Sequence, residues 1–495
     1  MKYYSTRDTN NIVSAAYAIA SGLAIDGGLF VPMSIPEVND EIIMALCKMD
    51  YAARAVKIMG MYLDEEFSEL ELREFASNAY SSNFDCNEVA PIHFINEKTG
   101  FLELWHGPTC AFKDMALQML PWLLSTSLKK LGERRRVCIL TATSGDTGKA
   151  ALEGFADVKG TSIIVFYPKN GVSEIQKLQM TTQRGDNLLV CAVDGNFDDA
   201  QSGVKEIFSD NLFAKKLDSQ EVFLSSANSI NWGRLLPQIV YYFSAYCEFV
   251  NSGNILLGDE IDFCVPTGNF GDILAGWYAK KMGLPIRKLI CASNSNNVLT
   301  DFINTGIYDR RRKFHTTISP SMDILVSSNL ERLLFMLSDA ETTADWMDQL
   351  KTKGKYNVGG KALAEISKDF DCGCCSDETA KKTINDTFIK DNYLIDPHTA
   401  NAYAVLSASR KRNQTEVPAI VVSTASPFKF PDSVLEALGK PADIEGDRMI
   451  GNLSAITKTP VPRPLENIGN RAVRFEGSIS KENMRRLILD FVTEN

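Results

Sequence analysis

The strongest constraint on the fold is an alternation of short apolar runs with helix-like stretches, which begins near Arg136. The runs read RVCIL, SIIVFY, LLVCAV, EVFLS, DFCVP, KLICAS and AIVVST, and most have a helix-like stretch between them. Continuous apolar strands that alternate with helices are typical of α/β proteins with mostly parallel sheets. Ligand sites in such proteins lie at the carboxyl ends of strands, so we expect functional residues directly after these runs.

The length of 495 residues indicates more than one domain. Residues 1–82 are predicted to form a separate N-terminal domain that is mainly helical after the block GLAIDGGLFVP. Residues 90–440 are predicted to form the core, with a smaller subdomain at about residues 130–250. Residues 441–495 are rich in Pro and Gly near their start and are predicted to form a C-terminal extension.

The composition limits the partners of the chain. There are 52 Lys and Arg against 62 Asp and Glu, a net charge of −10, which argues against nucleic acid or an anionic membrane as a partner. No apolar run approaches the length of a membrane span, and the N-terminal residues lack the layout of a signal peptide, so we expect a cytoplasmic protein. Most of the 11 cysteines stand singly in apolar stretches, which suits reduced thiols. The exceptions are Cys372, Cys374 and Cys375, read as a surface-loop cluster or as a metal site.

Lys113 stands in the middle of an otherwise apolar stretch, WHGPTCAFKDMALQML. The residues before it, 91–105, predict a hairpin, and the residues after it predict a buried helix with a kink or break near Pro121. Lys113 would then lie at the start of that helix, where unpaired N–H groups disfavour a cation and favour a neutral amine. The alternative is a structural lysine that reaches solvent and pairs with Asp114.

Three polar loops follow predicted strands. The first, residues 266–272 (PTGNFGD), precedes a predicted helix and forms either a phosphate cradle or only a tight turn. It lacks the Lys-Ser/Thr pair of a nucleoside-triphosphate loop and the spacing of a dinucleotide fingerprint. The second, residues 141–150 (TATSGDTGKA), suits a carboxylate or a second phosphate. The third, residues 423–430 (STASPFKF), ends a buried strand.

Three polar strand ends together with a lysine at a helix start indicate a site for an anionic cofactor that carries a carbonyl group. A neutral lysine amine can attack an aldehyde and form a Schiff base. Pyridoxal 5'-phosphate supplies both the aldehyde and the phosphate, so we predict that it is the cofactor and that Lys113 binds it.

With these motifs in place, the chain resembles threonine synthase of the bacterial and fungal type, a pyridoxal-phosphate enzyme of fold type II (tryptophan-synthase-β-like). The resemblance runs nearly end to end, and the blocks that carry it are YYSTR, GLAIDGGLFVP, HGPTCAFKD, TSGDTGKAAL, ANSINWGR, PTGNFGDILAG, LIDPHTANAY and STASPFKF. It implies two mostly parallel open-sheet domains and a mainly helical N-terminal domain. Two positions depart from the family's pattern, Asp8 where the family often has Gly and Ser426 where it often has His, and neither change removes a required chemical group.

The resemblance also implies roles for single residues. Lys113 matches the lysine that binds the cofactor, and Thr424 matches the hydroxyl that faces the pyridine nitrogen. The other residues implied to contact the cofactor lie in the loop that matches the family's phosphate-binding loop and are Gly268, Asn269, Phe270, Gly271 and Asp272. The residues that match the family's loop for the α-carboxylate of the substrate are Ser144, Gly145, Asp146 and Thr147. Asn231 and Arg234 match substrate-side contacts, for which the alternative is a capped helix start.

The family implies that the chain converts O-phospho-L-homoserine and water to L-threonine and phosphate. We expect a monomer or homodimer with no metal, and the net charge gives no reason to expect a nucleic-acid or membrane partner. Two alternatives stay open. A phospholyase would eliminate phosphate from the same substrate but release 2-oxobutyrate and ammonia. A non-catalytic anion-binding scaffold would keep Lys113 as a structural residue.

Overall fold

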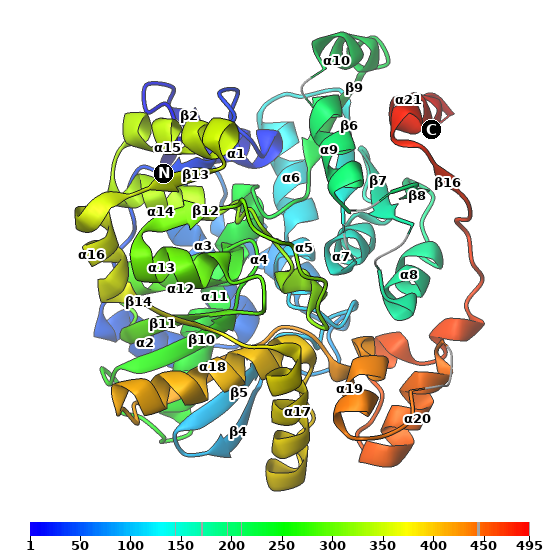
Figure 1. Ribbon diagram of the computed structural model, residues 1–495. Helices are drawn as coiled ribbons and strands as arrows, with labels where there is room; N and C mark the ends of the chain where they lie inside the picture. Colours follow the sequence, from blue (N-terminus) through cyan, green and yellow to red (C-terminus); the bar gives the residue numbers. More distant parts are fainter. Residues whose placement is uncertain (144, 170–171, 196, 209, 443–445, 495) are drawn as a thin grey trace.

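The computed structural model describes residues 1–143, 145–169, 172–195, 197–208, 210–442 and 446–494, and Figure 1 shows its sheets flanked by helices. One sheet has the strand order β16-β8-β7-β6-β9, and a second has the order β14-β11-β10-β15-β5-β4. Neighbouring strands of both sheets are parallel, except for the antiparallel hairpin of β4 and β5. The predicted α/β fold with mostly parallel sheets is therefore confirmed.

The strands of these two sheets include all seven apolar runs of the sequence. In β6, β7, β10 and β15 nearly every residue is buried, because helices cover both faces of the sheets. The strands are β4 (Ile92–Asn96), β5 (Thr99–Glu103), β6 (Arg136–Ala142), β7 (Thr161–Pro168), β8 (Leu188–Val193), β9 (Val222–Ser226), β10 (Ile261–Pro266), β11 (Ile286–Ser293), β14 (Phe370–Cys374), β15 (Ala419–Ser423) and β16 (Ser478–Ile479).

The helices connect these strands and cover the sheets. A two-stranded antiparallel pair lies among them, formed by β12 (Ile307–Asp309) and β13 (Lys355–Asn357). The helices from α5 onward are α5 (Asp114–Leu117), α6 (Leu120–Lys130), α7 (Asp146–Phe155), α8 (Glu174–Thr181), α9 (Phe197–Phe208), α10 (Asn211–Asp218), α11 (Trp232–Asn251), α12 (Gly271–Met282), α13 (Val298–Thr305), α14 (Leu330–Leu337), α15 (Ala340–Lys353), α16 (Gly359–Asp369), α17 (Asp377–Asp391), α18 (Pro397–Asn413), α19 (Pro431–Ala437), α20 (Arg448–Thr457) and α21 (Met484–Glu494).

The N-terminal residues carry both helices and a small sheet. Its strands have the order β2-β1-β3 and are antiparallel, which the mainly helical prediction for residues 1–82 did not include. The elements of this region are β1 (Lys2–Ser5), β2 (Val13–Ser14), α1 (Ala15–Ser21), β3 (Phe30–Pro32), α2 (Asp40–Cys47), α3 (Tyr51–Leu63) and α4 (Glu69–Ala79). The boundaries drawn for the three domains stay predictions.

The C-terminal residues return to the five-stranded sheet. Figure 1 shows the chain after α20 running along the outside of the molecule to α21. On the way, β16 pairs with β8 in parallel, and the N–H of Arg474 donates to the carbonyl of Thr181 at 2.8 Å. The predicted C-terminal extension thus contributes a strand to a sheet of the core.

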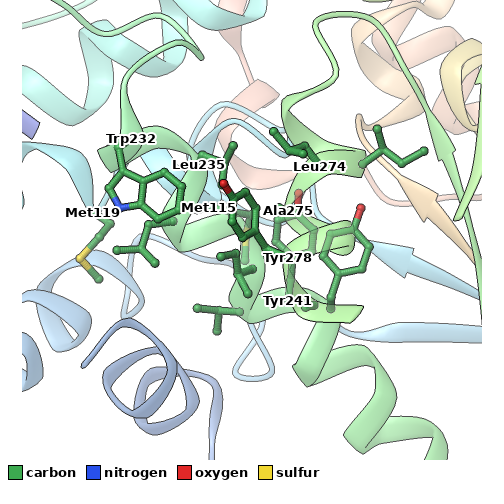
Figure 2. Close-up of a cluster of buried hydrophobic side chains, with 14 of the residues drawn as sticks. Met115, Met119, Trp232, Leu235, Tyr241, Leu274, Ala275 and Tyr278 are labelled. Atoms are coloured by element: carbon green, nitrogen blue, oxygen red, sulfur yellow. The ribbon is translucent and has the colours of Figure 1, made fainter. Parts of the chain in front are cut away.

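The largest buried cluster surrounds α11, which is apolar on nearly every side. Figure 2 shows Met115 of α5 packed among side chains of α11 and α12, including Leu235, Tyr241, Leu274 and Tyr278. Because α5 begins directly after Lys113, this packing fixes the backbone that carries the lysine.

Parallel neighbouring strands bring two of the predicted polar loops, residues 266–272 and 423–430, to the same edge as the segment that leads to Lys113. Strands β10, β15 and β5 are adjacent in the six-stranded sheet, so the residues after Pro266, Ser423 and Glu103 leave the sheet at the same edge.

None of the described helices is long and apolar enough to cross a membrane.

Candidate functional site

A small cavity at this edge collects residues from both sheets. Its walls include Lys113 and Phe112 after β5, Asp146 at the start of α7, and Thr424 after β15, and the full lining is Phe112, Lys113, Asp146, Ser321, His398, Thr424 and Ala425. The structure thus brings together predicted residues that lie more than three hundred positions apart. A larger cavity, of about 520 Å³, lies between α8 and the segment 473–478 and contains none of the predicted site residues.

Lys113 lies at the start of α5, as the sequence predicted, and α6 follows with Pro121 in its first turn. Its side chain is 12% exposed, and its Nζ is 4.7 Å from the ring centre of Phe112. Burial lowers the pKa of Lys113; Asp146 opposes this shift, and the cations Lys429 and Arg234 add to it. The helix α5 has only four residues, so burial rather than a long helix favours the neutral amine.

The predicted alternative for Lys113, an ion pair with Asp114, is wrong. Asp114 is fully buried and turns toward its own loop, where it accepts hydrogen bonds from the N–H of Thr109 at 2.8 Å and its hydroxyl at 2.7 Å. The acidic group near Lys113 is instead Asp146, whose Oδ2 lies 3.7 Å from Nζ.

Asp146 is held between several donors. Its Oδ1 lies 2.6 Å from Nζ of Lys429 and accepts a hydrogen bond from Nε2 of Gln176 at 2.9 Å. Burial raises the pKa of Asp146, but Lys429 and Lys113 more than offset this and hold it below its usual value. Asp146 is therefore a carboxylate at neutral pH.

The loop around Asp146 starts a helix, as predicted. Gly145 has a φ of 148°, a backbone conformation that favours glycine, and the N–H groups of Gly145 and Gly148 donate to the hydroxyl of Thr143 at 2.9 and 3.0 Å. Thr147 is half-buried in the first turn of α7. Ser144, the remaining predicted residue of this loop, lies outside the described residues.

The loop after β10 packs closely against the backbone at Ser321. A Cβ added to Gly268 would lie 2.5 Å from the carbonyl oxygen of Ser321, whereas one added to Gly271 would meet its nearest atom, Nδ2 of Asn329, at 3.3 Å. Phe270, not a glycine, takes the left-handed conformation here, with a φ of 63°. The side chain of Asn269 is exposed, and its carbonyl accepts from the N–H of Asn329 at 3.0 Å.

Asp272 turns away from this loop into the core. Its Oδ1 accepts from the hydroxyls of Tyr241 at 2.6 Å and Tyr242 at 2.9 Å, while its Oδ2 has no partner among the described residues. Burial raises the pKa of Asp272 to about 6, although both tyrosines lower it. Its contribution to the predicted cradle is therefore its place in the first turn of α12.

The two predicted substrate-side residues differ in whether their side chains have hydrogen-bonding atoms left for a ligand. Asn231 caps α11: its Oδ1 accepts from the N–H of Gly233 at 2.8 Å and its Nδ2 donates to the carbonyl of Ile19 at 2.9 Å, which fits a helix cap better than a substrate contact. Arg234 is buried, donates from Nη1 to the carbonyl of Ala227, and has no partner for Nε among the described residues. Burial lowers the pKa of Arg234 to about 10, so it remains a cation at neutral pH.

The sequence reasoning missed Lys429 and His398. Both lie in blocks that carried the resemblance, STASPFKF and LIDPHTANAY, and a lysine among apolar residues was the same signal that singled out Lys113. His398 Nδ1 lies 2.6 Å from Oδ2 of Asp396, and its Nε2 accepts from the N–H of Ser321 at 3.2 Å. This pair fixes the turn that faces Gly268.

The cysteine cluster is not a surface loop, which corrects the prediction. Cys372 and Cys374 lie in β14, the edge strand of the six-stranded sheet, and Cys372 and Cys375 are buried. The described group with metal-ligand spacing lies elsewhere and consists of Asp85, Cys86 and His106. The ring nitrogens of His106 lie 2.5 Å from Asp85 and 2.8 Å from Glu103, so this group is already satisfied by its own ion pairs.

These residues fit pyridoxal phosphate. A largely shielded amine, that of Lys113, and a hydroxyl, that of Thr424, line the same cavity. The loop after β10 packs so closely that a side chain at Gly268 would be excluded, and it ends at the N-terminus of α12, where N–H groups favour a phosphate. A buried guanidinium, Arg234, has a donor, Nε, without a partner in the part of the chain that the structure describes.

Comparison with known proteins agrees with this site. Residues 2–80 match the family model "Threonine synthase N terminus", residues 96–426 match "Pyridoxal-phosphate dependent enzyme", and residues 399–483 match "Threonine synthase, C-terminal". The threonine synthase of Pseudomonas aeruginosa is 41% identical over 88% of this chain and 90% of its own length. Threonine synthase-like 1 of Homo sapiens is also 41% identical, over 87% of this chain, but the match spans only 59% of its length.

A solved structure has the same fold as this chain. The crystal structure of pyridoxal-phosphate-bound threonine synthase from Brucella melitensis superposes with a TM-score of 0.88 at 36% identity, covering 100% of this chain and 99% of the other. Family models, relatives and fold agree, and the chain belongs to the threonine synthase family of pyridoxal-phosphate-dependent enzymes.

Proposed function

We propose that this chain is a threonine synthase, which converts O-phospho-L-homoserine and water to L-threonine and phosphate. The observation that carries the proposal is the amine of Lys113, on a side chain only 12% exposed, which shares its cavity with Thr424 and lies 3.7 Å from Asp146. The second candidate is the phospholyase, because a relative named only threonine synthase-like matches as well as a threonine synthase does.

In this proposal Lys113 and Thr424 would hold the reactive end and the ring of the cofactor, and the loop of residues 268–272 would hold its phosphate at the start of α12. The N–H groups of Asp146 and Thr147 hold the α-carboxylate of the substrate at the start of α7. Arg234, whose Nε has no partner among the residues that the structure describes, holds the phosphate of the substrate. The oligomeric state and the cytoplasmic location stay predictions.

When bound, the cofactor supplies an electron sink for the pair left at Cα. The neutral amine of Lys113 would remove the Cα proton, release it to solvent, and then remove a Cβ proton. Phosphate would leave from Cγ toward Arg234 and take up a proton from solvent, and the Lys113 ammonium would give its proton to Cγ. The oxygen of a water molecule would then bond to Cβ, and the proton that this water loses would pass through Lys113 to Cα, so the small cavity has to admit water at one position only. Premature release would give 2-oxobutyrate and ammonia.

The test is to incubate the full-length protein with O-phospho-L-homoserine and identify the products by mass spectrometry. We expect L-threonine and phosphate from the wild type and no product from Lys113→Ala, with Lys368→Ala, an exposed lysine, as the matched control. Borohydride reduction of the wild type should fix the cofactor on the peptide that contains Lys113. A cofactor fixed on another lysine, or full turnover by Lys113→Ala, would overturn the proposal.

A further inference from the structure

Lys429 is a fully buried lysine beside the cavity, at the end of a short turn after β15. Besides its contact with Asp146, its Nζ donates a hydrogen bond to the carbonyl of Thr109 at 2.9 Å. Removing an ammonium from water costs several kcal/mol, and an apolar side chain of similar size often stabilises a core equally well. The charge of Lys429 therefore indicates an electrostatic role rather than a packing role.

Asp146 lies between two lysines, and Lys429 is the nearer one. The distance to Lys429 is 2.6 Å, measured from Oδ1, and the distance to Lys113 is 3.7 Å, measured from Oδ2. Gln176 also donates to Oδ1, at 2.9 Å, so one carboxylate oxygen is held away from Lys113 by two donors. An uncompensated carboxylate here would attract a proton onto Lys113 and would repel an anionic substrate.

We propose that Lys429 is a positioning residue, which holds and neutralises the Asp146 carboxylate and so leaves Lys113 free to act as an amine. The inference rests on the proposed function, because it takes Lys113 to be the residue that binds the cofactor.

Removing the charge of Lys429 would act on Lys113 in two ways. One of the cations that lower the pKa of Lys113 would be lost, and Asp146 would have Lys113 as its remaining lysine partner. Both changes favour the ammonium form of Lys113. The charged and titratable groups around Lys113 come from several elements and are Asp114 of α5, Asp146 of α7, Arg234 of α11, Asp272 of α12, His398 of α18 and Lys429 itself.

The test measures how fast Lys113 takes up the cofactor, because this step needs a neutral amine. Full-length protein freed of cofactor is mixed with pyridoxal phosphate between pH 6 and 9.5, and attachment is followed by absorbance and by mass spectrometry of borohydride-reduced peptides. In Lys429→Met, the acid limb of the rate should move up by about one pH unit, a loss of about tenfold at pH 7. Lys429→Arg keeps the charge and should stay within about threefold of the wild type.

Two further variants test the role of Lys429, and the first of them does so even if Lys429→Met does not fold. Asp146→Asn should move the acid limb down, because Lys113 then loses its nearest carboxylate while the cations Lys429 and Arg234 stay in place. Lys429→Met combined with Asp146→Asn should return the limb to near its wild-type position. An unmoved limb in Asp146→Asn, or in a folded Lys429→Met, would overturn the inference, as would an equal loss of rate at every pH. Reduction of the wild-type cofactor onto another lysine would instead overturn the proposed function.

Discussion

At the scale of single residues, the glycines of the loop after β10 are not equivalent. Gly268 faces the backbone of Ser321, which cannot move aside alone, whereas Gly271 faces the side chain of Asn329, which can. We therefore expect Gly268→Ala to weaken pyridoxal phosphate binding by at least about tenfold, since it forces two backbones apart, and Gly271→Ala to have a smaller effect. Equilibrium titration with the cofactor measures both, and equal affinities in the two variants would contradict this account.

Asp272 makes stability depend on pH in an unusual direction. Its folded-state pKa of about 6 lies above the ordinary value of a carboxyl group, because burial disfavours the charge. The folded protein therefore binds a proton that the unfolded chain has lost, and the stability due to this group is lost as the pH rises from about 4 to about 6.

We expect Asp272→Asn, which keeps the size and the acceptor for Tyr241 and Tyr242, to stabilise the cofactor-free protein at pH 7.5 by on the order of 2 kcal/mol. At pH 4.5 the gain should shrink. Denaturant unfolding at the two pH values measures the difference, and a variant less stable than the wild type at pH 7.5 would show that the carboxylate is needed by the fold.

At the scale of elements, α5 and α7 carry the two groups that face each other, Lys113 and Asp146. They approach so closely that a Cβ on Gly154 of α7 would lie 2.1 Å from the carbonyl oxygen of Leu117 at the end of α5. Gly154→Ala should therefore push the helices apart, lower stability by about 2–3 kcal/mol and slow turnover.

Gly451→Ala is the matched control, because Gly451 lies inside α20 with nothing within 4 Å of an added Cβ. This change should be neutral or stabilise by about 0.5–1 kcal/mol, as alanine favours a helix. Thermal unfolding of both variants tests the pair. Similar shifts in melting temperature would mean that α5 and α7 do not pack as the structure shows.

Elements with a local signal were predicted from the sequence. The hairpin before Lys113, the seven core strands and the break near Pro121 follow from apolar pattern and turn residues within each segment. The strand β14 was missed because its sequence, FDCGC, lacks the apolar run of a buried strand, and it is an edge strand with only one neighbour. The placement of Lys429 against Asp146 could not be predicted, because the two residues meet only through tertiary packing.

At the scale of the whole molecule, the N-terminal residues are attached to the core by a buried ion pair. Glu331 of α14 is 6% exposed and accepts from Nε and Nη2 of Arg7, each at 2.8 Å, and from the hydroxyl of Thr6 at 2.6 Å. Arg7 precedes Asp8, the position that departs from the family's pattern, and it joins two regions more than three hundred residues apart in the sequence.

Glu331→Gln should destabilise the protein by about 2–4 kcal/mol, because it leaves the Arg7 guanidinium without its carboxylate. It should also make residues 1–82 easier to cleave in limited proteolysis. Glu341→Gln, on the exposed first turn of α15, is the control and should change stability by less than about 0.5 kcal/mol. If Glu331→Gln and Glu341→Gln both have the same free energy of unfolding as the wild type, the ion pair does not attach the N-terminal residues to the core.

We propose that Lys113 moves protons at Cα, Cβ and Cγ of O-phospho-L-homoserine to produce L-threonine, and one reaction tests these transfers directly. The wild-type protein is incubated with this substrate in deuterated water, and the products are identified by mass spectrometry and nuclear magnetic resonance. We expect L-threonine as the main product, with deuterium from solvent at both Cα and Cγ. Threonine without deuterium at Cγ would contradict the order of proton transfers, and 2-oxobutyrate as the sole product would contradict the assignment as a threonine synthase.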